Sequence, residues 1–387
     1  MKKLLALGLI CCYPGFCGYL GYVLFQTIPS QAGSSLTSPY SLLLTGTFPA
    51  FATVANGGQV VNTTSCGVNS IVCPADLIFA EDSGCSEAFG GWDVISYSPV
   101  TGQLTAAVEI PLLSNTRPVK IYGCVGNAAV TSFQGGPQGS AYDSNYLLAL
   151  HMEEGTGTTL YDSTANANNA IRKANSSPAP TASGRVGGGQ RFTGTANSTN
   201  NDYALFQTPT ALTNTYTIEY WTNATSYIDY DSVFLESSSG EPNVMSAFFW
   251  FPAGSVIYRN SWGGLSPTAP VTVPPGAFHY IVFARNGDSM NVFVDGVAGT
   301  AASGFGTGME RWKGLGWDGG PGSANSFNGI MDEVFYSNIA RSPDYVTARY
   351  NNISSPSTFY SVSPFTINKA APPSTTRANS QVTIFTF

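Results

Sequence analysis

The stretch His279-Tyr280-Ile281-Val282-Phe283-Ala284-Arg285-Asn286-Gly287-Asp288-Ser289-Met290-Asn291-Val292-Phe293-Val294 decides the fold class. Two runs rich in β-branched and aromatic residues flank an Asn-Gly turn, which is the strongest short-range signal for a β-hairpin. Similar runs fill the chain from Tyr40 onward, and turn residues punctuate them about every ten residues, as in all-β proteins. Only residues 342–350 resemble a helix start, and they predict a single turn of helix near the end of the second unit.

The length of 387 residues favours two folded units. Charged residues make up only 10% of the chain and the net charge is −7, so polarity is carried mainly by Ser, Thr, Asn and Gly. Basic residues form no stripe of the kind that a nucleic-acid backbone requires. The composition therefore predicts a globular chain that does not bind nucleic acid.

The N-terminus carries a targeting signal. Lys2-Lys3 precede an uncharged and mostly apolar run over residues 4–25, and small residues follow up to Ala32. This order predicts a signal peptide over residues 1–32, and the length of the apolar run leaves an uncleaved apolar helix that anchors the chain in a membrane as the alternative. Both alternatives predict a secreted or cell-surface protein that contacts membrane only through this segment.

Cysteine usage agrees with export. Four cysteines lie beyond the leader, all in the first folded region: Cys66, Cys73, Cys85 and Cys124. Their spacing lacks the paired knuckles typical of a zinc site, which favours two disulfides. Three pairings are open, and the short loop between the first two cysteines favours Cys66–Cys73 with Cys85–Cys124.

Composition shifts divide the chain further. A Gly-rich loop over residues 134–140 separates a β-rich, disulfide-containing unit at 36–140 from a second unit at 144–353. Residues 354–387 are rich in Ser, Thr and Pro and end in the alternating segment Gln381–Phe387. Such a segment can complete the sheet of a neighbouring molecule, which predicts self-assembly as one of its roles.

Four segments of the second unit carry a resemblance, in order along the chain: 147–157 with 161–166, 191–194 with 202–203, 278–282 through 294–296, and 327–334 through 340–342. They are similar to the opening strand, the "F-D-G…D-Y" strand, the "W-H-H-V…V-D-G" hairpin and the closing "F-N-G-x-I-D-E-V…A-R-S" strand of LamG-like domains. The second unit thus resembles the LamG-like members of the concanavalin A-like superfamily. The resemblance implies a jelly roll.

The first unit resembles an uncharacterised β-rich extracellular domain that commonly precedes a LamG-like one. Segments 76–81, 92–102, 108–114 and 121–127 carry the likeness. Two features depart from that family's pattern: the four cysteines, and Gly123-Cys124 in place of an aromatic pair. This resemblance informs architecture only, and it implies a β-sandwich ahead of the jelly roll.

Catalytic chemistry finds little support in the sequence. Glycoside hydrolases of the jelly-roll superfamily need paired carboxylates, and no E-x-D-x-E strand occurs. No G-x-S-x-G nucleophile elbow occurs either, and the two histidines, His151 and His279, lie in strands where packing roles are expected. We therefore expect a protein that is not an enzyme.

Two binding features remain. Aromatic residues in or beside Gly-rich loops predict a lectin-like surface on which sugar rings stack; they are Trp250, Tyr258, Trp262, Trp312 and Trp317. Glu154 and Asp332 lie on strands that a jelly roll brings side by side, which predicts a structural calcium site.

The sequence as a whole predicts an exported, non-enzymatic surface protein whose LamG-like unit binds a glycan or a surface protein. The alternative is a structural subunit of a cell-surface or virion appendage that assembles through its terminal strand.

Overall fold

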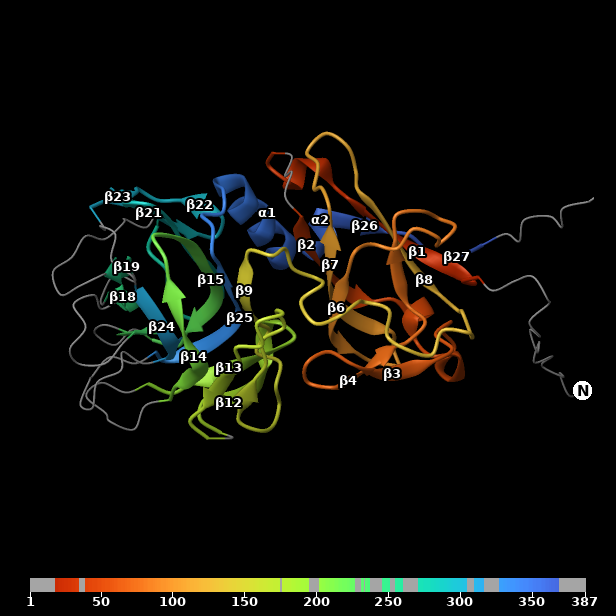
Figure 1. The fold of residues 1–387 in the computed structure, drawn as a ribbon, viewed down its shortest axis with the longest axis horizontal. Coiled ribbons are helices and arrows are strands. Elements are labelled where there is room, and N and C mark those ends of the chain that lie inside the picture. Colours follow the sequence, from red (N-terminus) through yellow and green to blue (C-terminus); the bar gives the residue numbers. More distant parts are fainter. Residues whose placement is uncertain are drawn as a thin grey trace, which may run out of the picture.

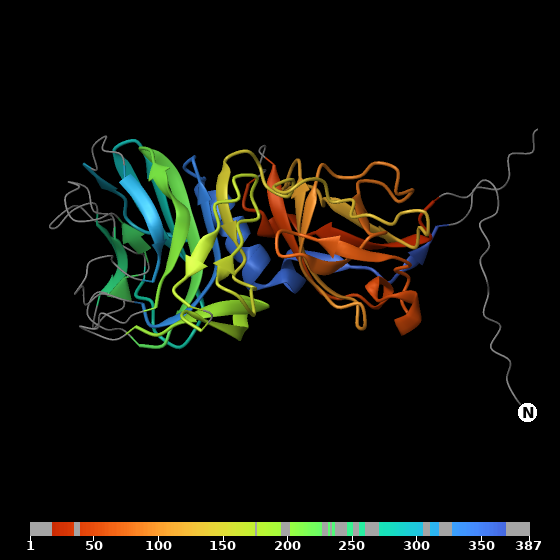
Figure 2. The same cartoon turned by 60° about the horizontal axis from the view of Figure 1, so that its bottom comes forward.

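Figure 1 shows the computed structural model, which describes residues 18–34, 39–174, 176–194, 202–226, 231–232, 234–236, 246–250, 255–259, 271–304, 310–316 and 327–368. Strands dominate these ranges, which confirms the all-β prediction. The strands form two units that lie end to end in Figures 1 and 2. We call residues 18–140 with 355–368 the first unit and residues 144–354 the second unit.

The first unit consists of antiparallel sheets in the orders β26-β1-β8-β5 and β2-β7-β6, with β27 also paired to β1, and a β3-β4 hairpin. Its strands are β1 (Gly21–Thr27), β2 (Tyr40–Thr47), β3 (Thr63–Cys66), β4 (Ile71–Pro74), β5 (Ile78–Ala80), β6 (Trp92–Tyr97), β7 (Gln103–Ile110), β8 (Lys120–Val125), β26 (Tyr360–Val362) and β27 (Thr366–Ile367). Three 3-10 helices cover Pro29–Gln31, Pro49–Phe51 and Val54–Asn56. Phe25, Phe48 and Phe51 pack against one another in its core.

The second unit is a sandwich of a nine-stranded sheet, in the order β12-β13-β25-β15-β20-β21-β22 with β9 and β23 added, and a five-stranded sheet, β10-β11-β14-β24-β17. The large sheet contains β9 (Tyr146–Leu150), β12 (Ala179–Val186), β13 (Gly188–Phe192), β15 (Thr215–Ala224), β20 (His279–Asn286), β21 (Ser289–Val294), β22 (Val297–Ala298), β23 (Ala302–Ser303) and β25 (Gly329–Ser337). The smaller sheet contains β10 (Thr159–Leu160), β11 (Ala170–Arg172), β14 (Ala204–Leu212), β17 (Phe234–Glu236) and β24 (Glu310–Leu315). A further sheet joins β16 (Asp231–Ser232), β18 (Ser246–Trp250) and β19 (Ser255–Arg259).

The hairpin that indicated the fold forms, with its turn one residue later than the Asn-Gly pair. Strands β20 and β21 pair in register up to Asn286 and Ser289, so Gly287 and Asp288 form a two-residue turn. Gly287 has a φ of 62°, a conformation that glycine adopts without a Cβ clash. In the large sheet, β20 pairs with β15, and β21 pairs with the short edge strands β22 and β23.

The N-terminal prediction is wrong beyond residue 20. Residues 21–25, expected in an apolar helix, belong to β1, which pairs with β8 on one side and with β26 and β27 on the other. Val23 and Phe25 lie in the core, and Ala32 is fully buried. Cleavage after Ala32 would remove a central strand, so a leader over residues 1–32 does not fit this fold.

The C-terminal boundary also differs from the prediction. Helix α1 (Pro343–Ser354) is longer than one turn, and Ser342 caps it by accepting a hydrogen bond from the Tyr345 N–H at 3.2 Å. Helix α2 (Pro356–Phe359), β26 and β27 then return to the first unit, as the blue segments in Figure 1 show. No helix in the described ranges is long and apolar enough to span a membrane. Residues 381–387 lie outside the description.

Helix α1 joins the two units. The side-chain amide of Asn352 makes two hydrogen bonds with the backbone of Leu43 in β2, at 2.8 and 2.9 Å. Arg349 donates to the Ser41 carbonyl at 3.1 Å. One hydrophobic core runs from the first unit into the outer face of the large sheet, so the units share a continuous, buried boundary.

Candidate functional site

The aromatic residues predicted to bind sugar fall in different surroundings. Trp312 in β24 is fully buried, packs edge to face on Phe206 at 4.9 Å between ring centroids, and donates to the Gly314 carbonyl. It is a core residue, so its prediction as an exposed platform is wrong. Trp250 and Tyr258 belong to β18 and β19, at the end of the second unit far from the first unit (Figure 1), and their side chains are outside the description. Trp262 and Trp317 also lie outside it.

The outer face of the large sheet is closed to ligands. Along β15, Ile218 and Tyr220 face the core of the sandwich, whereas Glu219 and Trp221 face the first unit and α1. Arg349 reaches that face from α1, with its guanidinium 3.8 Å from both Glu219 and Glu333. A buried ionic group of this kind requires its partners, and it fills the space that a ligand would need.

A cleft opens on the boundary between the units. It comprises two adjoining pockets that share Gly67, Val68, Asp93 and Ser163. The first unit contributes the β3–β4 turn, β6 and the segment 133–141, and the second unit contributes the residues that follow β9. The acidic and basic side chains that line it are Asp93, His151, Glu153 and Glu154.

His151 makes several polar contacts, whereas the sequence predicted only a packing role for it. One ring nitrogen lies 2.7 Å from Glu333 Oε1 and the other 2.6 Å from the Tyr142 hydroxyl, and Asp93 Oδ2 is 4.0 Å away. Burial alone lowers the pKa of His151, but Glu333 and Asp93 outweigh burial and raise it above its usual value. His151 therefore links carboxylates of both units at the back of the cleft.

The carboxyl groups of the cleft are held away from water. Burial raises the pKa of Glu153 to about 7, although the Gly188 N–H donates to it at 2.9 Å. Burial also raises the pKa of Asp93 and of Glu154. Sequence reasoning missed this site because its residues come from two units, and the only local signal was the run of titratable residues 151–154.

The two residues predicted to hold calcium have separate partners. Glu154 accepts from the Tyr161 N–H at 2.8 Å, whereas Asp332 accepts from the Val186 N–H at 2.7 Å. Among the described residues, no group of three or more His, Cys, Asp or Glu side chains is arranged to hold a metal ion. Calcium stays a prediction from the sequence.

Comparison with known proteins supports the resemblance of the second unit. Residues 197–347 match the Laminin_G_3 family model, described as the concanavalin A-like lectin/glucanases superfamily. Domain 4 of AbnA, an extracellular arabinanase from Geobacillus stearothermophilus solved with arabinotriose, has a TM-score of 0.40 and 15% identity, covering 52% of this chain and 97% of that chain. A SAP-like pentraxin from Limulus polyphemus has a TM-score of 0.35 and 16% identity, covering 41% and 78%. No curated protein matches the chain.

Proposed function

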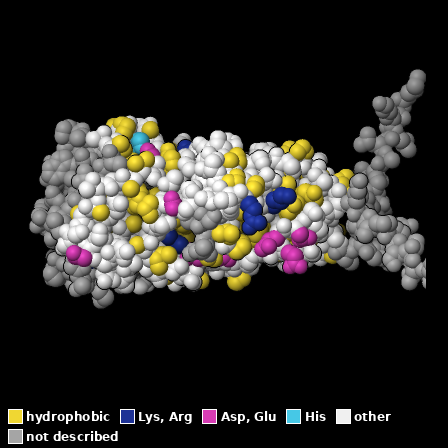
Figure 3. Space-filling model, turned by 90° about the horizontal axis from the view of Figure 1, so that it is seen from above, with side chains coloured by type: hydrophobic (Ala, Val, Ile, Leu, Met, Phe, Trp, Pro, Cys, Tyr) yellow, Lys and Arg dark blue, Asp and Glu magenta, His cyan; other side chains and the backbone are white. Residues whose placement is uncertain are grey.

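We propose that this chain is an exported, non-enzymatic surface protein whose second unit binds a glycan or a surface protein. The observation that carries the proposal is the match of residues 197–347 to the concanavalin A-like lectin/glucanases superfamily. The character of the surface is consistent with it: on the face seen in Figure 3, charged side chains form small scattered groups among neutral ones.

The binding surface we propose lies at the end of the second unit that faces away from the first unit. The outer face of the large sheet is covered by α1 and the first unit, so that face is not available to a ligand. Strands β18 and β19, which contain Trp250 and Tyr258, lie at that end (Figure 1). Trp262 and Trp317, which the sequence also predicts to bind sugar, lie outside the described residues.

A glycan array tests this function directly. We expect defined glycans of the array to bind the purified full chain. Trp317→Ala is expected to weaken this binding about tenfold, because stacking on an aromatic ring contributes about 0.5–1.5 kcal/mol beyond burial. Tyr122→Ala removes a half-buried ring from the first unit and is the matched control, which we expect to bind as the unchanged chain does.

Glycan binding and the size of any polymers together distinguish the lectin-like function from the alternative role in assembly. Absence of glycan binding, together with concentration-dependent polymers that disappear when residues 381–387 are deleted, would replace the lectin-like function with that of an appendage subunit. In the described part of the tail, β26 and β27 form the edge of their sheet, and a sheet edge can pair with a strand of another molecule.

Export, as we propose it, uses a leader that ends before β1. Mass spectrometry of the secreted chain is expected to place its first residue at or before Leu20, whose backbone N–H and carbonyl bond to Val125 and Asn368. A variant that begins at Gly33 lacks β1 and is expected to lose cooperative unfolding, whereas one that begins at Gly18 keeps it. Recovery of a folded, secreted chain starting at Gly33 would contradict this placement.

A further inference from the structure

The cleft between the units holds carboxylates that lack an adequate cationic partner. His151 is the basic group that acts on both Asp93 and Glu153, and it is already engaged with Glu333 and Tyr142. Among the nearby arginines, Arg172 acts on Glu154 of the cleft, whereas Arg185 acts on Asp332 and Arg349 lies between Glu219 and Glu333. Asp93 and Glu153 therefore share a basic neighbour, His151, that other groups already engage.

Two of these carboxylates each have an oxygen atom that accepts no hydrogen bond. Glu154 is 91% buried, since its exposed fraction is 9%, and its Oε2 has no hydrogen-bond partner. Glu153 uses Oε2 to accept from Gly188, and its Oε1 has no partner either. A buried acceptor without a donor destabilises the folded chain, and more so when it is charged. Both side chains line the cleft, so a donor that enters it would relieve this destabilisation.

The other pocket of the cleft presents two aromatic rings beside polar side chains such as Gln138 and Ser140. Trp92 and Phe133 line it with their ring centroids 6.2 Å apart, in an edge-to-face arrangement. The remaining wall includes Gly136 and Gly139, and the cavity volume is about 140 Å³. This part of the cleft suits a short hydrocarbon chain, and its aromatic faces also favour a nearby cation.

We propose that this cleft binds a primary ammonium group carried on an aliphatic chain. The ammonium donates to Glu153 and Asp93 and balances their charge, while the chain packs on Trp92 and Phe133. An ammonium group supplies three donors from a compact centre, and Glu153 and Asp93, one from each unit, both line the smaller of the two pockets. A polyamine and a lysine side chain both carry this group.

Calorimetry on the full chain with n-butylammonium tests the proposal. We expect binding that is at least tenfold tighter than that of n-butanol, which has the same length and no charge. Glu153→Gln and Asp93→Asn are each expected to weaken n-butylammonium at least tenfold, since each removes a charge-assisted hydrogen bond. Glu87→Gln neutralises an exposed carboxylate of the first unit and is expected to change nothing. Thermal unfolding of each variant verifies that the fold is retained.

The pH dependence of affinity gives a second, independent readout. Because the pKa of Glu153 is raised to about 7, its ionised form becomes dominant only above neutral pH. The alkylammonium stays protonated throughout this range. Affinity for n-butylammonium is therefore expected to rise between pH 6 and pH 8, and this rise is expected to diminish in Glu153→Gln. Equal binding of n-butanol, or affinity unaffected by Glu153→Gln and Asp93→Asn, overturns the proposal.

Two further probes identify the source of the ammonium group. Tighter binding of spermidine than of N-acetyl-lysine methylamide supports a free polyamine, and the reverse order supports a lysine of a partner protein. Failure of all three amines overturns the site. Trp317→Ala is expected to leave amine binding unchanged, so failure here and failure of the glycan function are separate results.

Discussion

Replacing Arg341 by alanine is expected to lower the free energy of unfolding by about 3–5 kcal/mol, because it strands a buried carboxylate. The Arg341 guanidinium donates to both carboxylate oxygens of Asp143, at 2.6 and 3.1 Å. The two side chains are only 2% and 4% exposed. The guanidinium also lies over the rings of Tyr146 and Tyr345, with 4.4 and 4.7 Å to their centroids, so packing is lost together with charge.

Guanidinium chloride titration measures this effect. Arg117→Ala is the matched control, since Arg117 is exposed, and we expect a change within about 0.5 kcal/mol. The double variant Arg341→Ala with Asp143→Ala is expected to be more stable than Arg341→Ala alone, because no unpaired charge remains. A single variant that unfolds at the same denaturant concentration as Arg117→Ala would show that the pair does not stabilise the boundary.

Removing the disulfide between Cys85 and Cys124 has the second large effect. The bond joins the loop after β5 to β8 across 39 residues, whereas Cys66–Cys73 spans only seven. In the chain-entropy model, the longer loop contributes about 4 kcal/mol and the shorter one about 2 kcal/mol. Cys85→Ala with Cys124→Ala is therefore expected to cost about twice as much stability as Cys66→Ala with Cys73→Ala.

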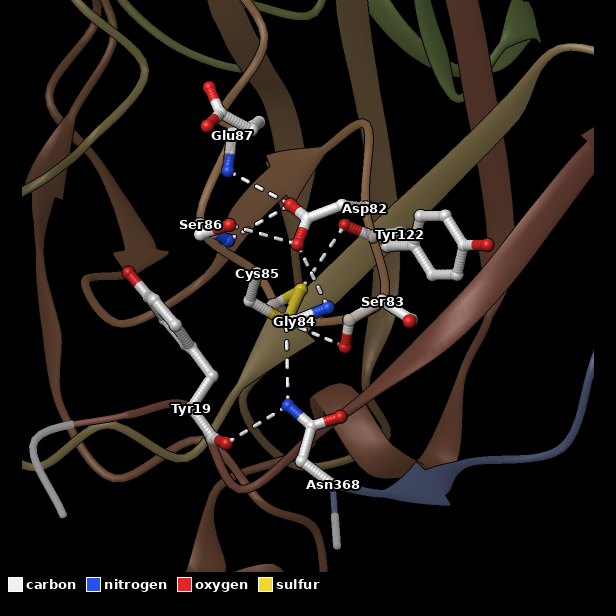
Figure 4. The surroundings of a disulfide bond; sticks show 10 residues. Tyr19, Asp82, Ser83, Gly84, Cys85, Ser86, Glu87, Tyr122 and Asn368 are labelled. Atoms are coloured by element: carbon white, nitrogen blue, oxygen red, sulfur yellow. Dashed lines mark hydrogen bonds between the residues drawn. A yellow bond between two sulfur atoms is a disulfide. The ribbon is translucent and has the colours of Figure 1, made fainter. Parts of the chain in front are cut away.

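The two double variants serve as controls for each other in one denaturation experiment without reductant. The long-range bond also lies beside both described chain ends (Figure 4). The Asn368 side chain donates to the Tyr19 carbonyl at 3.2 Å and lies 3.7 Å from the Cys85 sulfur. Earlier proteolysis near residues 18–20 and 368 is thus expected when this bond is removed. Equal losses of stability in both double variants would contradict the loop-length argument.

Short sequence patterns predicted the structure correctly where residues close together in the sequence determine it. The hairpin 279–294 has its own turn residue in Gly287, and the structure contains both disulfides in the pairing that loop length favoured, Cys66–Cys73 and Cys85–Cys124. The LamG-like resemblance likewise rests on short segments, and the family match over residues 197–347 confirms it in that range.

Patterns failed where the half-exposed positions of a strand are apolar as well, as Tyr22 and Leu24 are in β1, whose residues alternate between buried and half-exposed. Residues 21–27 form a central strand, and their apolar character continues that of the preceding segment, so they were assigned to a leader. Trp312 stands among glycines in the sequence, which suggested a loop, yet it lies in β24 and faces the core. Neither the return of 355–368 to the first unit nor the joining of Asp93 to His151 has a local signal, because both depend on tertiary packing.

The position of β1 determines how the molecule resists force. Its N-terminal end emerges beside Asn368, at the end of the first unit far from the second unit (Figures 1 and 2). A pull on residue 18, directed away from the second unit, loads the hydrogen bonds to β8, β26 and β27 in shear, so they must break together rather than one by one. A chain tethered by its N-terminus would thus be held by a mechanical clamp closed by its own C-terminal strands.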